Sequence, residues 1–146
     1  MNLLPVVLDT NWTLDLLLFK DPRTQAFATV LAHQHVQWWA TPAMRAELER
    51  VLGYAHLLQY MARFPQPAAQ TATRVLQEFD AFVVAAPEAP KCNARCRDPD
   101  DQIFIDLAVA HQATLLSKDR AVLAMRRSVA GMEACISDTW PRKKSP

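Results

Sequence analysis

The stretch PVVLDTN, residues 5–11, decides how the rest of the chain is interpreted. Residues 6–8 form a short apolar run, which predicts a strand buried on both faces. The run ends on Asp9, and the chain then enters the apolar stretch WTLDLLL at residues 12–18. A lone buried carboxylate is costly unless it is paired or takes up a proton. Asp9 therefore needs a partner, which could be a helix N-terminus, an arginine or a metal ion.

The composition is that of one globular domain. The chain has 146 residues, of which 51% are hydrophobic, and its formal net charge is +1. This charge gives no general attraction to nucleic acids or membranes, so any polyanion must be bound by a local patch. No apolar run approaches the length of about 18 residues that spans a bilayer, and no signal peptide is evident. We expect a cytoplasmic protein with no membrane partner, one domain over residues 1–139 and a disordered basic tail, WPRKKSP, over residues 140–146.

The three cysteines argue against a disulfide framework. An odd number of cysteines without a signal peptide favours reduced thiols in the cytosol. Cys92 and Cys96 have C-x3-C spacing, but no other Cys or His pair completes a zinc-binding pattern. A zinc site is therefore disfavoured.

Strand and helix signals alternate along the chain, which favours an α/β fold with a mostly parallel sheet of about five strands. Strands are predicted at residues 6–8, 36–40, 82–85, 114–117 and 134–136. Helical segments are predicted at residues 9–33 with a break at 21–22, and at 41–58, 67–79, 98–112 and 120–128. A loop over residues 86–97 carries the cations Lys91, Arg95 and Arg97.

Two carboxylates follow predicted strands. Asp9 ends the first strand, and Asp119 comes just after the strand at residues 114–117. In an open parallel sheet, ligands bind beyond the carboxyl ends of the strands. Asp9 and Asp119 are therefore expected at the edge where a functional site forms.

A third acid lies on a predicted helix, TPAMRAELERVL, at residues 41–52. Glu47 falls at the edge of the apolar stripe that contains Met44 and Leu48, whereas Glu49 falls well outside it. On its own, Glu47 is better explained as a boundary residue paired with Arg50 or Arg74.

A fourth acid lies in RDPDDQIFIDLAVAH, residues 97–111. Asp98 and the first-turn acid Asp100 are explained by capping and the helix dipole. Asp101 shares a face with Phe104 at i+3 and with later apolar residues, so its carboxylate is expected to need a cation. Asp106 is expected on the opposite, solvated face.

Converging carboxylates repel one another. At about 4 Å and an effective dielectric constant of about 20, each pair costs on the order of 4 kcal/mol. No histidine or buried arginine is placed to neutralise these acids, whereas Mg²⁺ and Mn²⁺ prefer oxygen ligands. Such ions activate water and stabilise the leaving oxygen in phosphodiester hydrolysis. We therefore expect the strand to end on Asp9 because it holds a metal ion.

The segments VVLDTN, AELERVL and DPDDQIFIDLAVAHQATLLSKD, in this order, resemble PIN-domain nucleases. The resemblance covers about residues 6–136 and is greatest for the bacterial branch of toxins from toxin–antitoxin pairs. It implies a three-layer α/β/α PIN-like fold and an endoribonuclease that uses one or two Mg²⁺ or Mn²⁺ ions to hydrolyse single-stranded RNA. It also implies a possible antitoxin partner and a possible homodimer.

The resemblance assigns roles to individual residues. It makes four acids the catalytic and metal-binding residues: Asp9, Glu47, Asp101 and Asp119. The supporting residues it implies are Asn11, Ser117 and Asp98. There are two departures from the family pattern, since Trp12 replaces a small aliphatic residue and Lys118 is an unusual neighbour for Asp119.

Two alternatives remain open at this point. A phosphoaspartyl phosphatase needs Asp-x-Asp, but position 11 is Asn, and a receiver domain needs an acidic pair that the first strand lacks. A PIN fold that binds RNA or an antitoxin without cutting is a second alternative, although all four acids are present. We expect the RNA backbone to contact a basic rim formed by Lys91, Arg95, Arg97 and Lys118.

Overall fold

A five-stranded parallel sheet forms the centre of the molecule. The computed structural model describes residues 3–64 and 71–141. The strands are β1 (Leu4–Leu8), β2 (Val36–Ala40), β3 (Val83–Ala85), β4 (Thr114–Leu116) and β5 (Cys135–Ser137). Their order is β3-β2-β1-β4-β5, and all four neighbouring pairs are parallel. The prediction of a mostly parallel sheet of about five strands is confirmed.

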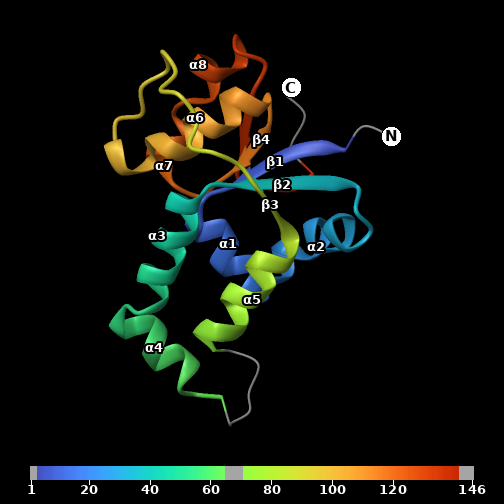
Figure 1. Ribbon diagram of the computed structural model, residues 1–146, viewed down its shortest axis with the longest axis vertical. Coiled ribbons are helices and arrows are strands. Elements are labelled where there is room, and N and C mark those ends of the chain that lie inside the picture. The colour runs from blue at the N-terminus through green and yellow to red at the C-terminus, as the bar shows by residue number, and fades with distance from the viewer. Residues whose placement is uncertain (1–2, 65–70, 142–146) are drawn as a thin grey trace.

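Helices cover both faces of this sheet, which gives three layers (Figure 1). Helices α1, α2, α3 and α5 lie on one side, and α6, α7 and α8 lie on the other. The elements on the first side, including the 3-10 turn η1, are α1 (Thr10–Leu17), η1 (Pro22–Thr24), α2 (Gln25–Ala32), α3 (Pro42–Leu52), α4 (Ala55–Met61) and α5 (Ala72–Phe82). The elements on the second side are η2 (Pro99–Asp101), α6 (Gln102–His111), α7 (Arg120–Leu123) and α8 (Arg126–Ala130). Among the helices of the described residues, none has both the length and the apolar character needed to cross a membrane.

The core forms where the central strand meets the helices. Val6 and Val7 of β1 have no exposed surface, as expected for a strand buried on both faces. Phe104 on α6 is also fully buried, and Trp38 on β2 packs edge-on against Phe79, with 5.3 Å between ring centroids. Each such side chain contributes about 1.5–3 kcal/mol by leaving water. This packing holds β1 rigidly, and with it the residues that follow β1.

The direction in which successive strands are added reverses at the centre of the sheet, and we call this position the crossing point. The chain proceeds from β1 outward through β2 to β3, and then returns to the other side of β1 for β4 and β5. The reversal therefore lies between β1 and β4, where Leu8 pairs with Leu116. Ligands of open α/β sheets bind at such a reversal, beyond the carboxyl ends of the strands.

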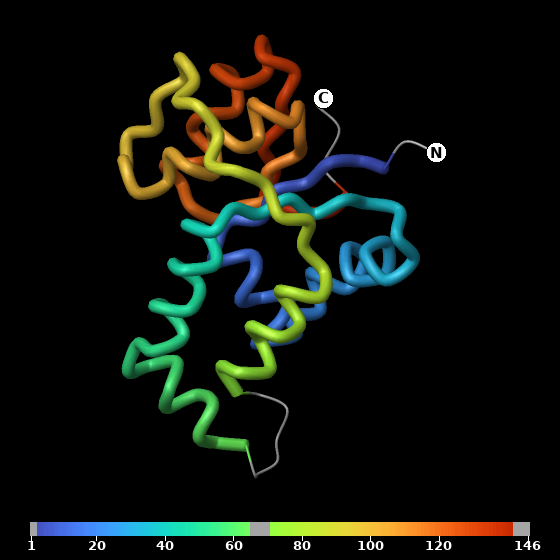
Figure 2. Tube along the Cα trace, in the orientation of Figure 1, coloured from blue at the N-terminus to red at the C-terminus, as the bar shows by residue number. Residues whose placement is uncertain are grey.

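The helix predicted at residues 41–58 is two helices. Helix α3 ends at Leu52, because Gly53 and the extended backbone of Tyr54 interrupt it before α4 begins at Ala55. The stripe residues Met44, Leu48 and Leu52 are buried as predicted, but Ala55 is exposed after the change of direction. Helices α3, α4 and α5 together extend away from the sheet (Figure 2).

Other element boundaries also differ from the predictions. Helix α5 is capped by Thr71 and continues to Phe82, where a strand was expected, and the predicted start near residue 67 lies outside the described residues. The segment 120–128 forms two short helices, α7 and α8. Trp140, which was placed in the tail, packs against Phe27 with ring centroids 5.5 Å apart. Residues 142–146 of the predicted tail lie outside the described residues.

The prediction that Asp106 is solvated is wrong. Asp106 is 5% exposed. Its Oδ1 accepts hydrogen bonds from the Cys92 backbone N–H at 3.0 Å and from Gln102 Nε2 at 2.9 Å. Gln102 in turn donates to the Ala94 carbonyl at 2.8 Å and accepts from the Cys96 N–H at 2.6 Å. The loop 86–98 therefore covers the face of α6 that faces away from the sheet, and buried polar bonds fix the loop there.

We expect Asp106→Ala to lower the free energy of unfolding by on the order of 3 kcal/mol, because it leaves two donors without their acceptor. Asp106→Asn keeps one acceptor oxygen and should cost less. Urea unfolding followed by circular dichroism measures both changes, and hydrogen exchange at the Cys92 amide reports the loop directly. Glu49→Ala, at an exposed position, is the control and should change stability by less than about 0.5 kcal/mol. A loss for Asp106→Ala no larger than that of the control would contradict the role given to Asp106.

Candidate functional site

Asp9 lies at the crossing point, directly after β1. Its backbone is extended, and its Oδ1 accepts from the Thr10 N–H at 2.7 Å, so Asp9 caps α1. Its other oxygen, Oδ2, accepts from the Ser117 hydroxyl at 2.6 Å and from Asn11 Nδ2 at 3.3 Å. Asp9 is 4% exposed. The partner that the sequence required for this carboxylate is thus, in part, a helix N-terminus and a hydroxyl group.

Hydrogen bonds connect the residues after β4 to the residues after β1. The Ser117 hydroxyl, which donates to Asp9, also accepts from the Asp119 N–H at 3.0 Å. The side-chain oxygen of Asn11 accepts from the Lys118 N–H at 3.1 Å. Asn11 and Ser117 therefore lie where the resemblance places them, one beside the first acid and the other between the first and the fourth. Asp119 itself caps α7, since its Oδ1 accepts from the Ala121 N–H at 2.7 Å.

Glu47 reaches this edge from α3. It accepts a hydrogen bond from the hydroxyl of Thr10, the residue after Asp9. Its second oxygen lies 3.7 Å from the Arg50 guanidinium. The Glu47 side chain is only 19% exposed, whereas that of Glu49 is 62% exposed and pairs with Arg45 at 3.2 Å. Glu47 thus satisfies both interpretations made from the sequence, because it pairs with a nearby arginine and also faces the residues after β1.

Asp101 lies at the junction of η2 and α6. Its Oδ2 is buried and has no hydrogen-bond partner. Asp98 has the capping role expected of it, because its side chain accepts from the Asp100 N–H at 3.0 Å. An orphaned carboxylate oxygen is rare in a folded protein, since each buried acceptor without a partner is costly. A cation bound at this oxygen would supply the missing interaction.

Burial and the neighbouring acids raise the pKa of Asp9 and of Asp101. Burial is the largest cause that raises the pKa of Asp9 to about 6, the charges of Glu47 and Asp119 raise it further, and the bonds from Ser117 and Thr10 oppose the change. Burial also raises the pKa of Asp101 to about 7, with the charges of Asp9, Asp119, Asp98 and Glu47 as the further causes. The charges of these carboxylates therefore act on one another, although burial has the larger effect.

The acids are not, however, gathered around a common point. In residues 3–64 and 71–141, no group of three or more Asp, Glu, His or Cys side chains has the arrangement of a formed metal site. Hydrogen bonds explain this spacing, because Asp119 is turned toward its own helix and Glu47 toward Thr10. The donor set still suits a hard divalent cation, which prefers carboxylate oxygens, and Asp101 offers one such oxygen with no other partner. The residues present therefore fit Mg²⁺ or Mn²⁺.

Two residues that contribute to this edge were not predicted. Thr10 orients Glu47, and Asp15 holds Lys118, with Asp15 Oδ2 2.6 Å from the Lys118 ammonium. Asp15 is 7% exposed. A signal was present in the sequence, because a lone acid inside the apolar stretch WTLDLLL must find a partner when it is buried. The identity of that partner depended on the position of β4 beside β1.

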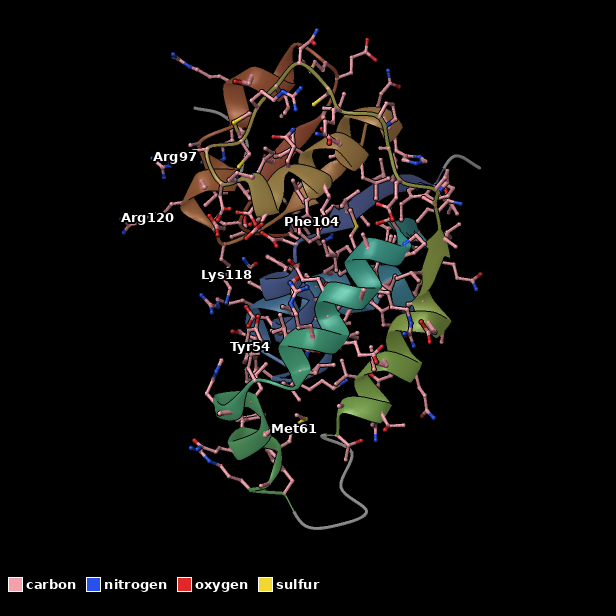
Figure 3. The ribbon with its side chains drawn as sticks, turned by 60° about the vertical axis from the view of Figure 1, so that its left-hand side comes forward. Tyr54, Met61, Arg97, Phe104, Lys118 and Arg120 are labelled. Atoms are coloured by element: carbon pink, nitrogen blue, oxygen red, sulfur yellow. The ribbon has the colours of Figure 1, made fainter. Side chains whose placement is uncertain are left out.

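Three of the predicted basic residues lie on one loop. Lys91, Arg95 and Arg97 are exposed on the loop 86–98. Figure 3 shows Arg97, Arg120 and Lys118 along the same side of the molecule. The Lys118 side chain is 40% exposed, although its ammonium is paired with Asp15.

A comparison with family models adds to this geometry. A model described as PIN domain matches residues 5–121, which include all four acids. The chain belongs to the PIN-domain family. PIN domains are generally nucleases and generally use divalent metal ions. No match was found among curated proteins or among solved structures. The fold and the family of the sequence-based resemblance are thus confirmed, and the family match favours a PIN domain over a phosphoaspartyl enzyme.

The raised pKa values predict how the metal-free PIN domain responds to pH. Asp9 and Asp101 bind protons more tightly in the folded state than in the unfolded chain, where the ordinary value is 3.8. Their contribution to stability is therefore complete below about pH 4 and is lost as the pH rises to about 7. Between about pH 5 and about pH 8, the free energy of unfolding of Asp9→Asn should fall less than that of the wild type. The difference between the two falls should be on the order of 1 kcal/mol.

This prediction is measured by urea unfolding in EDTA at the two pH values. Glu49→Gln is the matched control, since Glu49 is exposed and distant from the crossing point, and it should follow the wild type. The raised pKa of Asp9 would be disproved if Asp9→Asn and the wild type lost the same stability between the two pH values.

Proposed function

We propose that this PIN domain is a metal-dependent endoribonuclease that hydrolyses phosphodiester bonds in single-stranded RNA. The observation that carries the proposal is the buried, unpartnered Oδ2 of Asp101, which lies among carboxylates whose charges raise its pKa. Such an arrangement is unfavourable without a cation, and a hard divalent ion is the cation that carboxylates bind best. The family match supports a nuclease, since PIN domains are generally hydrolases of this kind.

In this proposal the four acids Asp9, Glu47, Asp101 and Asp119 hold one or two Mg²⁺ or Mn²⁺ ions. When bound, such an ion supplies an activated water and stabilises charge on the phosphate oxygens. The protein's own groups fix the acids in place. Ser117 and Asn11 donate to Asp9, and Thr10 donates to Glu47, so each of these two acids presents a defined oxygen.

The substrate must approach an edge that carries net negative charge. The exposed cations Lys91, Arg95 and Arg97 lie on the loop that Asp106 and Gln102 attach to α6, the helix that begins after Asp101. We infer that this basic rim, with the exposed part of Lys118, follows the RNA backbone. Asp98 helps by capping η2, which places the loop beside Asp101.

The cellular role we propose is that of the toxin in a toxin–antitoxin pair. Its support is the likeness of the DPDDQIFIDLAVAH and LLSKD segments to that branch of the family. A cognate antitoxin protein, a homodimer and a cytoplasmic location belong to this proposal. A PIN fold that binds RNA or an antitoxin without cleaving it is the competing function, and a cleavage assay separates the two.

We expect Asp9→Asn, Glu47→Gln and Asp101→Asn each to reduce manganese-dependent cleavage of a fluorescent single-stranded RNA by more than about 100-fold. The reason is that each change removes a proposed metal ligand, and the loss of a residue that merely supports a ligand already costs about 10- to 100-fold. Initial rates with a titration of Mn²⁺ measure the effect, and circular dichroism checks that each variant folds.

Glu49→Gln is the matched control for Glu47→Gln, because it lies two residues away on the exposed side of α3. Its rate should equal that of the wild type. Equal rates for Glu47→Gln and Glu49→Gln would show that Glu47 has no part in the reaction. A wild type with no cleavage in Mn²⁺ or Mg²⁺, but with measurable RNA binding, would favour the competing, non-cleaving function.

The basic rim predicts a change in salt dependence. Replacing Lys91, Arg95 and Arg97 together by alanine should weaken RNA binding and flatten its dependence on salt. Each lost phosphate contact reduces the slope of log affinity against log salt by about 0.7 on a single strand. Fluorescence anisotropy over a range of KCl concentrations measures this slope, and calorimetry with Mn²⁺ should show an unchanged metal affinity. An unchanged salt slope would place the RNA elsewhere on the molecule.

A further inference from the structure

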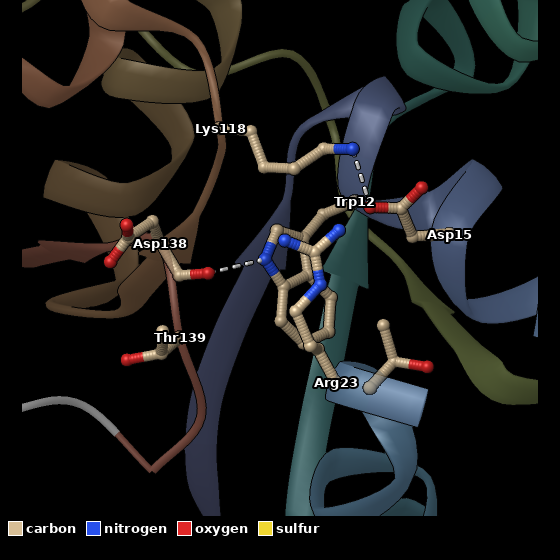
Figure 4. A pocket seen from close by; sticks show the side chains of 7 residues that line it. Trp12, Asp15, Arg23, Lys118, Asp138 and Thr139 are labelled. Atoms are coloured by element: carbon tan, nitrogen blue, oxygen red, sulfur yellow. Dashed lines mark hydrogen bonds and ion pairs between the residues drawn. The ribbon is translucent and has the colours of Figure 1, made fainter. Parts of the chain in front are cut away.

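A cavity of about 260 Å³ lies among residues that follow β1, β4 and β5, and none of the four acids lines it. Its walls come from α1, η1, the loop after β4 and the loop after β5 (Figure 4). Lys118, which forms one wall, directly precedes Asp119 in the chain. We refer to this cavity as the Trp12 pocket, because Trp12 closes its inner end.

The inner wall of the Trp12 pocket is rigid and apolar. The Trp12 side chain is 3% exposed, its indole N–H donates to the Asp138 carbonyl at 3.1 Å, and its ring packs edge-on against Phe27 with centroids 5.6 Å apart. Figure 4 shows the Arg23 side chain in front of the indole. Since the Arg23 side chain is 74% exposed, its flat guanidinium can move aside or lie against a ligand without disturbing the core.

The polar groups of the Trp12 pocket are electrically balanced. Lys118 and Arg23 bring positive charge, but Asp15 lies 2.6 Å from the Lys118 ammonium, and Arg23 is bonded to Asp21 at 2.8 Å. A bare phosphate would meet the Asp15 carboxylate and would compete with it for Lys118. A neutral, planar group with N–H donors and carbonyl acceptors on its rim fits better, because the walls offer both kinds of partner and an apolar inner end.

The volume limits the ligand to one small group. Pockets for drug-sized ligands begin at about 300 Å³, so a cavity of about 260 Å³ suits a single heterocycle. A nucleobase has this size, this planarity and this mixture of donors and acceptors. Proteins that recognise single-stranded RNA commonly hold an unstacked base against aromatic rings or an arginine plane.

We propose that the Trp12 pocket binds one nucleobase of the single-stranded substrate, a short and fixed distance along the strand from the scissile phosphate. This inference rests on the proposed function, and it makes the pocket the source of a base preference. The face of the base lies against Trp12 and the Arg23 guanidinium, and its polar edge contacts Asp15 and Lys118. The pair formed by Asp15 and Lys118 thus separates the base from the acidic edge.

Two variants change the Trp12 pocket without touching the four acids. Arg23→Ala removes the exposed guanidinium, and Thr139→Phe fills the cavity from the half-buried residue that lines it after β5. Arg63→Ala is the matched control, since Arg63 is exposed just beyond α4, far from the crossing point. Arg23→Ala keeps the test valid if Thr139→Phe fails to fold, because Arg23 forms only an exposed contact with Asp21.

The first measurement does not depend on cleavage. The four nucleoside monophosphates are titrated into metal-free, ¹⁵N-labelled protein, and the indole N–H signal of Trp12 is followed by NMR. We expect at least one nucleotide to shift this signal, and we expect Arg23→Ala and Thr139→Phe to weaken that binding by about tenfold, the usual scale for losing one base contact. The Arg63→Ala control should bind as the wild type does.

The second measurement uses RNAs in which one abasic site is moved along the strand. For the wild type and Arg63→Ala, an abasic site at one position relative to the cut should reduce kcat/KM by about tenfold. Arg23→Ala and Thr139→Phe should cut all of these RNAs at similar rates. Base-independent cleavage by the wild type, together with a Trp12 signal that no nucleotide shifts, would overturn the pocket proposal while leaving the nuclease intact. A wild type that cuts no RNA but whose Trp12 signal responds to nucleotides would instead overturn the proposed function alone.

Discussion

The hydrogen bond from Ser117 to Asp9 joins the two halves of the sheet at the point where they diverge. Asp9 directly follows β1 and Ser117 directly follows β4, so their side chains meet because Leu8 and Leu116 are in register. The same hydroxyl accepts from the Asp119 N–H, and the same carboxylate caps α1. Sheet register, helix start and acid placement therefore depend on one another, and none of the three can shift alone.

This constraint has an energetic cost that the rest of the molecule offsets. A carboxylate as buried as Asp9, among other acids, favours its neutral form, as the rise of its pKa shows. The apolar residues of β1 and α6 hold the strand in place despite this cost. Functional sites commonly store such unfavourable interactions, and the surrounding core keeps them in position. The buried Asp101 oxygen belongs to the same pattern, since it has no hydrogen-bond partner within the part of the chain that the structure describes.

Much of this arrangement could be predicted from the sequence, because it depends on local signals. The fold class followed from three local signals: the apolar run before Asp9, the capping residues and the alternation of strands and helices. The predicted position of Glu47 relative to Glu49 on their helix was also correct. What could not be predicted depends on contacts between distant segments. Asp106 appeared solvated because the loop that covers it has no regular pattern, and Asp15 gained its partner only through the position of Lys118. The end of α3 before Gly53 was not predicted, because a glycine that a helix tolerates and a glycine that ends a helix look alike in a sequence.

The separation of the two bonded residues along the chain also bears on how the molecule is made. Asp9 and Ser117 are 108 residues apart, and β1 lies between β2 and β4 in the sheet. During synthesis, β1 and β2 can pair early, but one edge of β1 stays open until β4 emerges from the ribosome. Pairings over such a separation are slow to form, and an open strand edge invites contacts with other chains. The nascent protein thus completes its acidic centre only after β4 has emerged, so chains that stop before β4 lack the assembled site.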